Sequence, residues 1–122
     1  LGNNPLPIVE IIPKRKFFDY QAKYSSGDTS YVVPARLPSQ ISRRAQDEAL
    51  RAHRALGCFG FSRVDVILSK DGPVVLEINS IPGFTPTSLL PKAARAQGIE
   101  FAELCKQILR LAYEKEKNRP VY

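Results

Sequence analysis

Two neighbouring segments in the middle of the chain alternate between apolar and polar residues. In the first segment a valine separates Arg63 from Asp65, and in the second an isoleucine separates Glu77 from Asn79. Because successive side chains of a β-strand point to opposite faces, each of these polar pairs shares one face of its strand. The opposite face carries Val64, Val66, Leu68, Val74, Leu76 and Ile78. The pattern therefore predicts two strands with one polar face and one face turned toward a core.

Residues 70–72 (Lys-Asp-Gly) separate the two segments and predict a tight turn, so that the strands form a hairpin. A three-residue loop at this position pairs Asp65 with Glu77 on the same face. Adjacent carboxylates repel each other, which destabilises the fold unless a cation lies between them. Oxygen ligands from Asp65, Glu77 and Asn79 suit a divalent ion, and Mg²⁺ commonly binds one or two protein carboxylates together with nucleotide phosphates. The hairpin is therefore a candidate magnesium site.

Hydrophobic periodicity and turn-forming residues predict the remaining elements. These are a strand at 6–12, a loop at 14–28, a strand at 29–33, a helix capped by Ser39 and ending near Leu56, a short helix capped by Thr87 or Ser88 and ended by Gly98, and a terminal amphipathic helix that starts near Phe101. Residues 114–122 are mostly charged and are expected to fray. This order predicts an α+β fold in which helices pack on a mostly antiparallel sheet.

Composition narrows the class of protein only slightly. The chain has 122 residues, enough for one modest core, and no apolar run long enough to span a membrane. Its net charge of +6 does not separate a nucleic-acid-binding module from a site for ATP phosphates, because the basic residues are scattered rather than gathered in one stripe. Cys58 and Cys105 are expected to be reduced core thiols, and His53 is expected on the surface of its helix.

Several short motifs occur in order along the chain. They are Leu-Pro-Ile-Val-Glu-Ile at 6–11, Phe-Asp-Tyr-Gln-Ala-Lys-Tyr at 18–24, Arg-Val-Asp at 63–65, Leu-Glu-Ile-Asn-Ser-Ile-Pro-Gly-Phe-Thr at 76–85 and Ser-Leu-Leu-Pro at 88–91. Together they resemble the C-terminal part of the D-alanine–D-alanine ligase family of ATP-grasp enzymes. The resemblance implies that residues 1–122 form the C-terminal portion of an ATP-grasp catalytic domain, with 14–28 as a mobile active-site loop and the rest of the polypeptide upstream.

For the hairpin, the resemblance implies two magnesium or manganese ions that bridge the β- and γ-phosphates of ATP. Asp65 and Glu77 would hold one ion, and Glu77 with Asn79 the second. Arg63, together with the backbone N–H of Gly83, would form an oxyanion hole for the tetrahedral intermediate. One feature departs from the family: its aspartate and glutamate are commonly one residue further apart than Asp65 and Glu77, which leaves the register of the hairpin open.

The resemblance also assigns roles outside the hairpin. Ser88 and the backbone of Leu89 would receive the carboxylate of the second D-alanine, at a helix N-terminus that favours anions. Lys23 would contact phosphate, and Tyr24 would help to close the site and exclude water. Relatives that make D-alanyl-D-lactate usually lack this Lys-Tyr pair, so its presence favours an amine as the second substrate.

The implied activity is ATP-dependent ligation of two D-alanines through an acylphosphate, to supply the dipeptide of peptidoglycan. We therefore expect a cytoplasmic enzyme, commonly a dimer in this family, that binds neither nucleic acid nor membrane. We expect this portion alone to be inactive, because the adenine contacts and the first amino-acid site would lie upstream. The alternatives are a D-alanine–D-lactate or D-alanine–D-serine ligase and, from another class, a basic module that binds nucleic acid.

Overall fold

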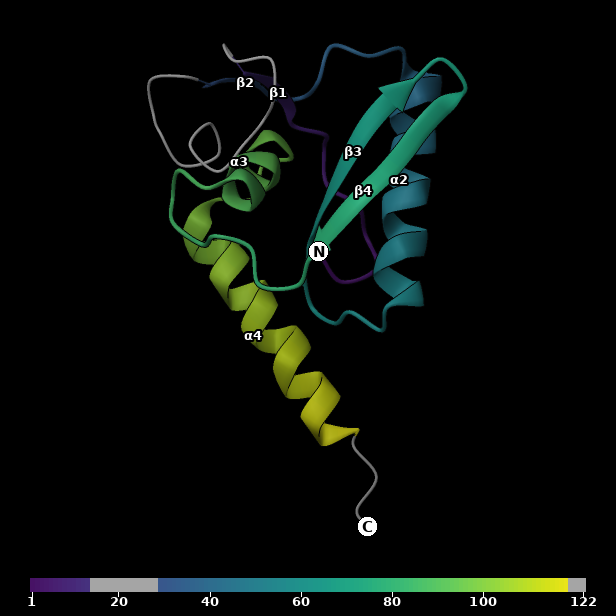
Figure 1. The fold of residues 1–122 in the computed structure, drawn as a ribbon. Helices are drawn as coiled ribbons and strands as arrows, with labels where there is room; N and C mark the ends of the chain where they lie inside the picture. The colour runs from purple at the N-terminus through teal and green to yellow at the C-terminus, as the bar shows by residue number, and fades with distance from the viewer. Residues whose placement is uncertain (14–28, 119–122) are drawn as a thin grey trace.

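The computed structural model describes residues 1–13 and 29–118, which form helices and antiparallel strands (Figure 1). The elements are β1 (Glu10–Pro13), β2 (Thr29–Val32), α2 (Ser39–Ala55), β3 (Arg63–Ser69), β4 (Gly72–Asn79), α3 (Leu89–Ala96) and α4 (Phe101–Lys117). Their order confirms the predicted succession of strands and helices, and the α+β class is confirmed with it.

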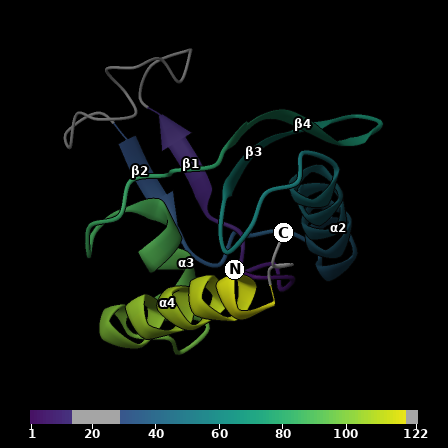
Figure 2. The same cartoon turned by 90° about the horizontal axis from the view of Figure 1, so that it is seen from below.

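The strands form two separate antiparallel sheets rather than one. β1 pairs with β2, and β3 pairs with β4. Helix α2 packs along the β3–β4 hairpin, while α3 and α4 pack on each other on the other side of the hairpin (Figures 1 and 2). The β1–β2 sheet lies beside α3, where the ammonium group of Lys92 is 5.5 Å from the centre of the Tyr31 ring. The hairpin is therefore packed on one side by α2, and α3 and α4 lie on its other side.

The β3–β4 turn is shorter than the sequence suggested. Ser69 pairs with Gly72, which leaves two residues, 70–71, in the turn. The expected three-residue loop is thus wrong by one position. Gly72 has a φ of 128°, a conformation that residues with a Cβ rarely adopt, and glycine is therefore required where the chain leaves the turn.

A β-bulge compensates for the shorter turn. Val66 pairs with Val75 but Asp65 pairs with Glu77, so Leu76 is an extra residue on β4. Without the bulge, the register set by the turn would place Asp65 opposite Leu76. The bulge brings the two carboxylates directly opposite each other, and the predicted pairing of Asp65 with Glu77 is confirmed.

The bulge also changes which side chains face the core. Leu68, Val74 and Leu76 are 45%, 46% and 64% exposed, so the expectation that they face a core with the other aliphatic residues is wrong. Val74 pairs with Ile67, which by alternation shares the face of Asp65. On β4 the predicted alternation therefore holds only between the bulge and the end of the strand that is far from the turn. Leu68 lies on β3, which has no inserted residue, and is exposed beside the turn.

Helix α2 begins one residue earlier than a Ser39 cap would require. Pro38 occupies the cap position and Ser39 is the first helical residue, so the predicted capping role of Ser39 is wrong. The backbone N–H groups of Ile41 and Ser42 donate to the Pro38 carbonyl instead. Ala45 is buried, whereas Leu56, near which the helix was expected to end, lies just beyond it and is exposed.

His53 is buried, at 7% exposure, and its expected place on the helix surface is wrong. It follows Ala45 and Ala49 at intervals of four residues, which places it on the covered face of α2. Its Nδ1 is 2.6 Å from the Ser62 hydroxyl, in the segment that leads into β3. The pKa of His53 is lowered below its ordinary value of 6.5, first by burial and then by the positive charge of the neighbouring Arg54.

We expect His53 to make the protein less stable in mild acid. Because the folded state disfavours the charged imidazole, the unfolded state binds more protons once the pH falls below about 6.5, and stability is then lost progressively. Urea unfolding of the complete protein at pH 7.5 and 5.5 measures this loss. In a His53→Phe variant the part of the loss due to this side chain should disappear; an unchanged difference between the two pH values would refute the assignment.

Helices α3 and α4 bury most of the remaining core. The buried aliphatic side chains there are Leu90, Ala93, Ala94 and Leu104. Leu109 of the amphipathic helix α4 is exposed, and α4 continues to Lys117, past Glu114, where fraying was expected to begin. Cys58 and Cys105 are unpaired, as expected, and half-buried. Within the described ranges, no helix has the length and apolar character needed to cross a bilayer.

Candidate functional site

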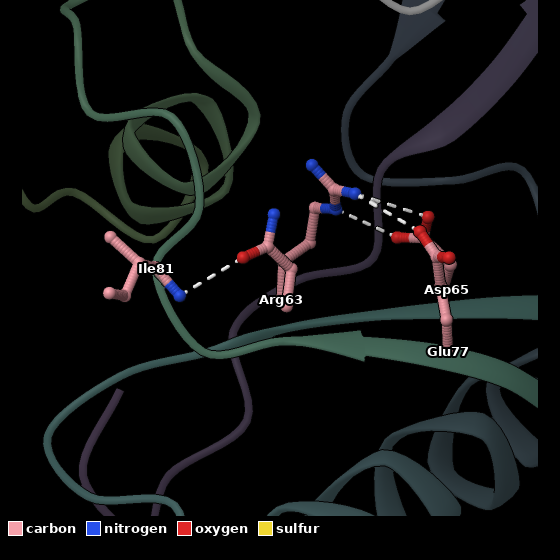
Figure 3. Close-up of polar contacts among 5 residues, drawn as sticks. Arg63, Asp65, Glu77 and Ile81 are labelled. Atoms are coloured by element: carbon pink, nitrogen blue, oxygen red, sulfur yellow. Dashed lines mark hydrogen bonds and ion pairs between the residues drawn. The ribbon is translucent and has the colours of Figure 1, made fainter. Parts of the chain in front are cut away.

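The guanidinium group of Arg63 points toward the neighbouring carboxylates of Asp65 and Glu77 on one face of the hairpin (Figure 3). Its Nε donates to Asp65 Oδ1 at 2.8 Å and its Nη2 donates to Asp65 Oδ2 at 3.2 Å. The same Nη2 is 3.7 Å from Glu77 Oε1. The Arg63 and Asp65 side chains are 19% and 18% exposed, and Glu77 is 54% exposed. The two-pronged bond to Asp65 fixes the orientation of the guanidinium group.

This arrangement revises one step of the sequence argument. The repulsion between Asp65 and Glu77 was expected to require a bound ion, but Arg63 already places a positive charge beside both carboxylates. The spacing of Arg63 and Asp65 on one strand face predicts their proximity, whereas the contact of the guanidinium group with Glu77 depends on the register across the hairpin. A metal ion is therefore not needed to explain how the fold tolerates the two acids.

The same donor set nevertheless fits a divalent cation. A carboxylate accepts several hydrogen bonds or metal bonds at once, so the contacts with Arg63 do not exhaust the oxygens of Asp65 and Glu77. Asn79 Oδ1 accepts a hydrogen bond from the Ile81 N–H at 3.0 Å, and a second lone pair remains (Figure 3). Among the described residues, no three His, Cys, Asp or Glu side chains form a metal cluster, so an ion here would need oxygens from outside the hairpin, such as water or phosphate, to complete its coordination.

The loop after β4 presents an accessible backbone at Gly83. Pro82 is buried and Gly83 is exposed, so the chain is anchored immediately before the position whose amide was predicted to be functional. Among the residues the structure describes, the Gly83 N–H has no hydrogen-bond acceptor. A Cβ at this position would lie 3.3 Å from the Ser88 hydroxyl, so any larger side chain would crowd the start of α3. The amide is thus available to a ligand that approaches the loop.

Ser88 occupies the cap position of α3, as predicted, but its side chain forms no capping bond with the helix. Its hydroxyl accepts a hydrogen bond from the Thr85 N–H at 3.0 Å and lies 2.7 Å from the Thr85 hydroxyl. These bonds close the loop upon itself and hold Gly83 next to Ser88. Either hydroxyl can be the donor in the bond between Thr85 and Ser88, so when Thr85 donates, the Ser88 hydroxyl proton can be given to a carboxylate. The Leu89 N–H lies at the start of the helix.

The predicted site residues therefore fall into two groups. The hairpin brings together Arg63, Asp65, Glu77 and Asn79, and the loop with the start of α3 brings together Gly83, Ser88 and Leu89. The bond from the Ile81 N–H to Asn79 links the groups along the chain. The two remaining predictions, Lys23 and Tyr24, lie outside the described residues.

Sequence reasoning missed an apolar surface beside the carboxylates. Ile67, Val74 and Leu76 are all more than two-fifths exposed, and Leu76 directly precedes Glu77. Alternation along β3 places Ile67 on the face of Asp65, but the bulge that exposes Leu76 and moves Val74 to that face leaves no local mark in the sequence. This surface can contact an apolar group of a ligand or another part of the polypeptide.

An ion pair at the base of the β1–β2 sheet was also missed. Arg36 donates from Nε to Glu10 Oε2 at 3.2 Å and from Nη2 to Oε1 at 3.1 Å, and its backbone N–H donates to Oε2 at 3.2 Å. The side-chain bond from Arg36 is the main reason that the pKa of Glu10 is lowered. The pair joins the start of β1 to the segment after β2, and a separation of 26 residues gives no local signal for it.

Comparison with known proteins gives a consistent result. A family model described as "D-ala D-ala ligase C-terminus" matches residues 2–110. The chain is 50% identical to a D-alanine–D-alanine ligase of Syntrophotalea carbinolica over 89% of its own length and 36% of the relative. It is 47% identical to a ligase of the same name from Desulforudis audaxviator, over 94% of this chain and 39% of the relative. The chain thus spans well under half the length of these curated relatives.

Solved structures match in the same way. The structure of D-alanine–D-alanine ligase from Bacillus anthracis complexed with ATP superposes with a TM-score of 0.79 and 36% identity, over 95% of this chain and 38% of that one. The VanG D-Ala:D-Ser ligase from Enterococcus faecalis superposes with a TM-score of 0.70 and 36% identity, over 87% of this chain and 31% of that one. The second match means that the fold is shared by ligases with different second substrates.

Proposed function

The chain belongs to the D-alanine–D-alanine ligase C-terminal family, and we propose that it forms the metal, phosphate and second-substrate half of an active site that joins two D-alanines at the expense of ATP. The observation that carries this proposal is the cluster of Arg63 with Asp65 and Glu77, which combines acids that suit a metal–phosphate complex with a fixed guanidinium group. The remainder of the polypeptide would supply the adenine contacts and the first amino-acid site.

In the first step, a carboxylate oxygen of one D-alanine attacks the γ-phosphorus of ATP, the bond to the β-phosphate oxygen breaks, and ADP and an acylphosphate form. Magnesium or manganese held by Asp65, Glu77 and Asn79 would neutralise the charge of the phosphates. Arg63, held by Asp65, adds a donor whose direction is already set, so little reorganisation is needed as charge moves. Lys23 is proposed to contact phosphate as well.

In the second step, the amine of the second D-alanine attacks the acylphosphate carbon. The carbonyl oxygen becomes negatively charged in the tetrahedral intermediate, the carbon–oxygen bond to phosphate then breaks, and the proton lost by the nitrogen leaves with the phosphate. Arg63 and the accessible N–H of Gly83 are proposed to bind that oxygen, while Ser88 and the Leu89 N–H bind the carboxylate of the incoming D-alanine. Tyr24 is proposed to help exclude water, which would otherwise hydrolyse the acylphosphate.

The proposal includes where and how the enzyme works. Because the reaction consumes ATP and supplies a peptidoglycan precursor, we place it in the cytoplasm. We expect the complete enzyme to be a dimer, as is common in this family. The cation–π and ion-pair contacts of the described residues occupy many basic side chains, including Lys92 and Arg63, which argues against a nucleic-acid-binding module.

Phosphate release by the complete enzyme tests the assignment. With ATP and Mg²⁺, D-alanine alone should support turnover, because it can serve as both substrates. D-serine and D-lactate are each tested as the second substrate beside D-alanine, with the product identified by mass spectrometry. A mixed product in place of D-alanyl-D-alanine would favour the ligase with another second substrate. Absence of turnover with D-alanine alone would refute our assignment, and residues 1–122 alone serve as the inactive control.

A further inference from the structure

Three phenylalanine rings connect parts of the chain that carry different portions of the proposed site. The rings of Phe61 and Phe84 are 5.9 Å apart and tilted by 47°. The rings of Phe84 and Phe101 are 5.3 Å apart and tilted by 37°. Both distances lie in the range of favourable tilted aromatic pairs. We call Phe61, Phe84 and Phe101 the ring stack.

Each ring belongs to a different element. Phe61 lies two residues before Arg63, at the entry to β3. Phe84 directly follows Gly83 in the exposed loop, and Phe101 is the first residue of α4. The central ring therefore ties the loop with the Gly83 amide both to the strand that carries Arg63 and to a helix that contributes no residue to the proposed site.

The loop needs such an anchor because its hydrogen bonds do not reach β3: Arg95 Nη2 of α3 donates to the Pro86 carbonyl at 3.1 Å, and the others are local. The Ser88 hydroxyl bonds with Thr85, and the Ile81 N–H donates to Asn79, so both contacts join residues only two or three positions apart. Such bonds shape the loop but do not fix its position relative to β3. Among the described residues, the ring contacts of Phe84 are the aromatic contacts between this loop and other elements.

We propose that Phe84 and Phe101 are positioning residues, which act through the ring stack to hold the Gly83 amide at a fixed place relative to Arg63. This inference rests on the proposed function, because it assumes that these two donors share one developing oxyanion. Donors that are preorganised stabilise a transition state more than donors that must first move into place. A displaced Gly83 amide should therefore impair the chemical step while ATP binding continues.

The experiment uses the complete enzyme with Phe84→Leu and Phe101→Leu, which keep an apolar side chain but remove the ring. We expect kcat to fall by about 10- to 100-fold, as small displacements of reacting groups can cause, while KM for ATP changes less than about twofold. A tetrahedral phosphinate analogue of the dipeptide should lose affinity by the same factor as kcat, because it mimics the state that the donors bind. The double variant should be little worse than the poorer single variant.

Phe59→Leu is the matched control. This ring lies two residues before Phe61 but is 46% exposed, under the ammonium group of Lys115 at 4.6 Å, and it is not part of the ring stack. We expect Phe59→Leu to leave kcat and the affinity for the analogue unchanged. Urea unfolding of all variants identifies any that merely fail to fold, and Phe101→Tyr, which keeps the ring, should restore activity.

Two outcomes would overturn the inference. One is a normal kcat in Phe101→Leu; the other is a loss of kcat with unchanged affinity for the phosphinate analogue. If the proposed function itself is wrong, the wild-type enzyme will make no dipeptide, which distinguishes that failure from failure of the inference. Even in that case, hydrogen exchange of residues 81–86 decides whether the ring stack holds the loop, since exchange should rise in Phe101→Leu and not in Phe59→Leu.

Discussion

Replacing Glu77 with glutamine is expected to lower kcat/KM of the complete enzyme by about 1,000-fold, which corresponds to about 4 kcal/mol of lost charge stabilisation around the phosphates. Glutamine has nearly the same shape as glutamate but carries no charge and is a weaker metal ligand. Glu77 is the sharper position for this test, because Asp65 also holds Arg63 through two hydrogen bonds. An Asp65→Asn variant would change both the metal site and the orientation of the guanidinium group.

The measurement is phosphate release as a function of Mg²⁺ concentration, together with calorimetric titration of the metal in the presence of a non-hydrolysable ATP analogue. Glu77→Gln should require a much higher Mg²⁺ concentration and should not reach the wild-type rate. Glu48→Gln is the matched control, since Glu48 forms an exposed ion pair with Arg51 on α2, at 2.9 Å, outside both groups of site residues. Near-normal activity and an unchanged dependence on Mg²⁺ in Glu77→Gln would refute the proposal that the hairpin binds the metal.

The sequence predicts the central hairpin well because alternation is a local signal. Arg63 and Asp65 must share a strand face wherever the strand packs, and Glu77 must lie near Asp65 once the chain turns back at residues 70–72. The details that fix the register are not local. The two-residue turn and the bulge at Leu76 shift the chain by one position in opposite directions, and only their combination gives the observed pairing of Asp65 with Glu77.

The failures of prediction have the same physical origin. His53 was expected on the surface of an amphipathic helix, but the chain folds back and places the Ser62 hydroxyl 2.6 Å from its Nδ1. Leu76 reads as a core residue until the bulge turns it outward. Arg63 was expected to be a donor to a substrate; its spacing from Asp65 predicts that contact, but its contact with Glu77 appears only when both strands are in register. In each case the surroundings of the side chain depend on residues that lie further along the chain, and local periodicity does not indicate those residues.

Replacing Arg63 with lysine is expected to separate two roles of the guanidinium group: a positive charge near two acids, and a donor of fixed direction to the oxyanion. Lysine keeps the positive charge near Asp65 and Glu77, so the fold and the binding of ATP should persist. It cannot reproduce the two-pronged bonds from Nε and Nη2 to Asp65, and its ammonium group is free to rotate. The developing oxyanion then loses a donor of fixed direction, and we expect kcat to fall by about 100- to 1,000-fold. Steady-state kinetics and the affinity for a fluorescent ATP analogue measure the two roles separately.

Arg36→Lys provides the matched control for this prediction. Arg36 also binds a carboxylate with two prongs, through Glu10, but the pair lies at the base of the β1–β2 sheet rather than on the hairpin. If loss of a two-pronged ion pair impaired the enzyme simply by loosening the fold, both substitutions would lower kcat and the unfolding midpoint together. A loss of kcat confined to Arg63→Lys, with nucleotide affinity retained, is the result expected when the guanidinium group contacts the reacting atoms. Equal losses of kcat in Arg63→Lys and Arg36→Lys would contradict that role, because Arg63 would then act only as a structural partner of Asp65.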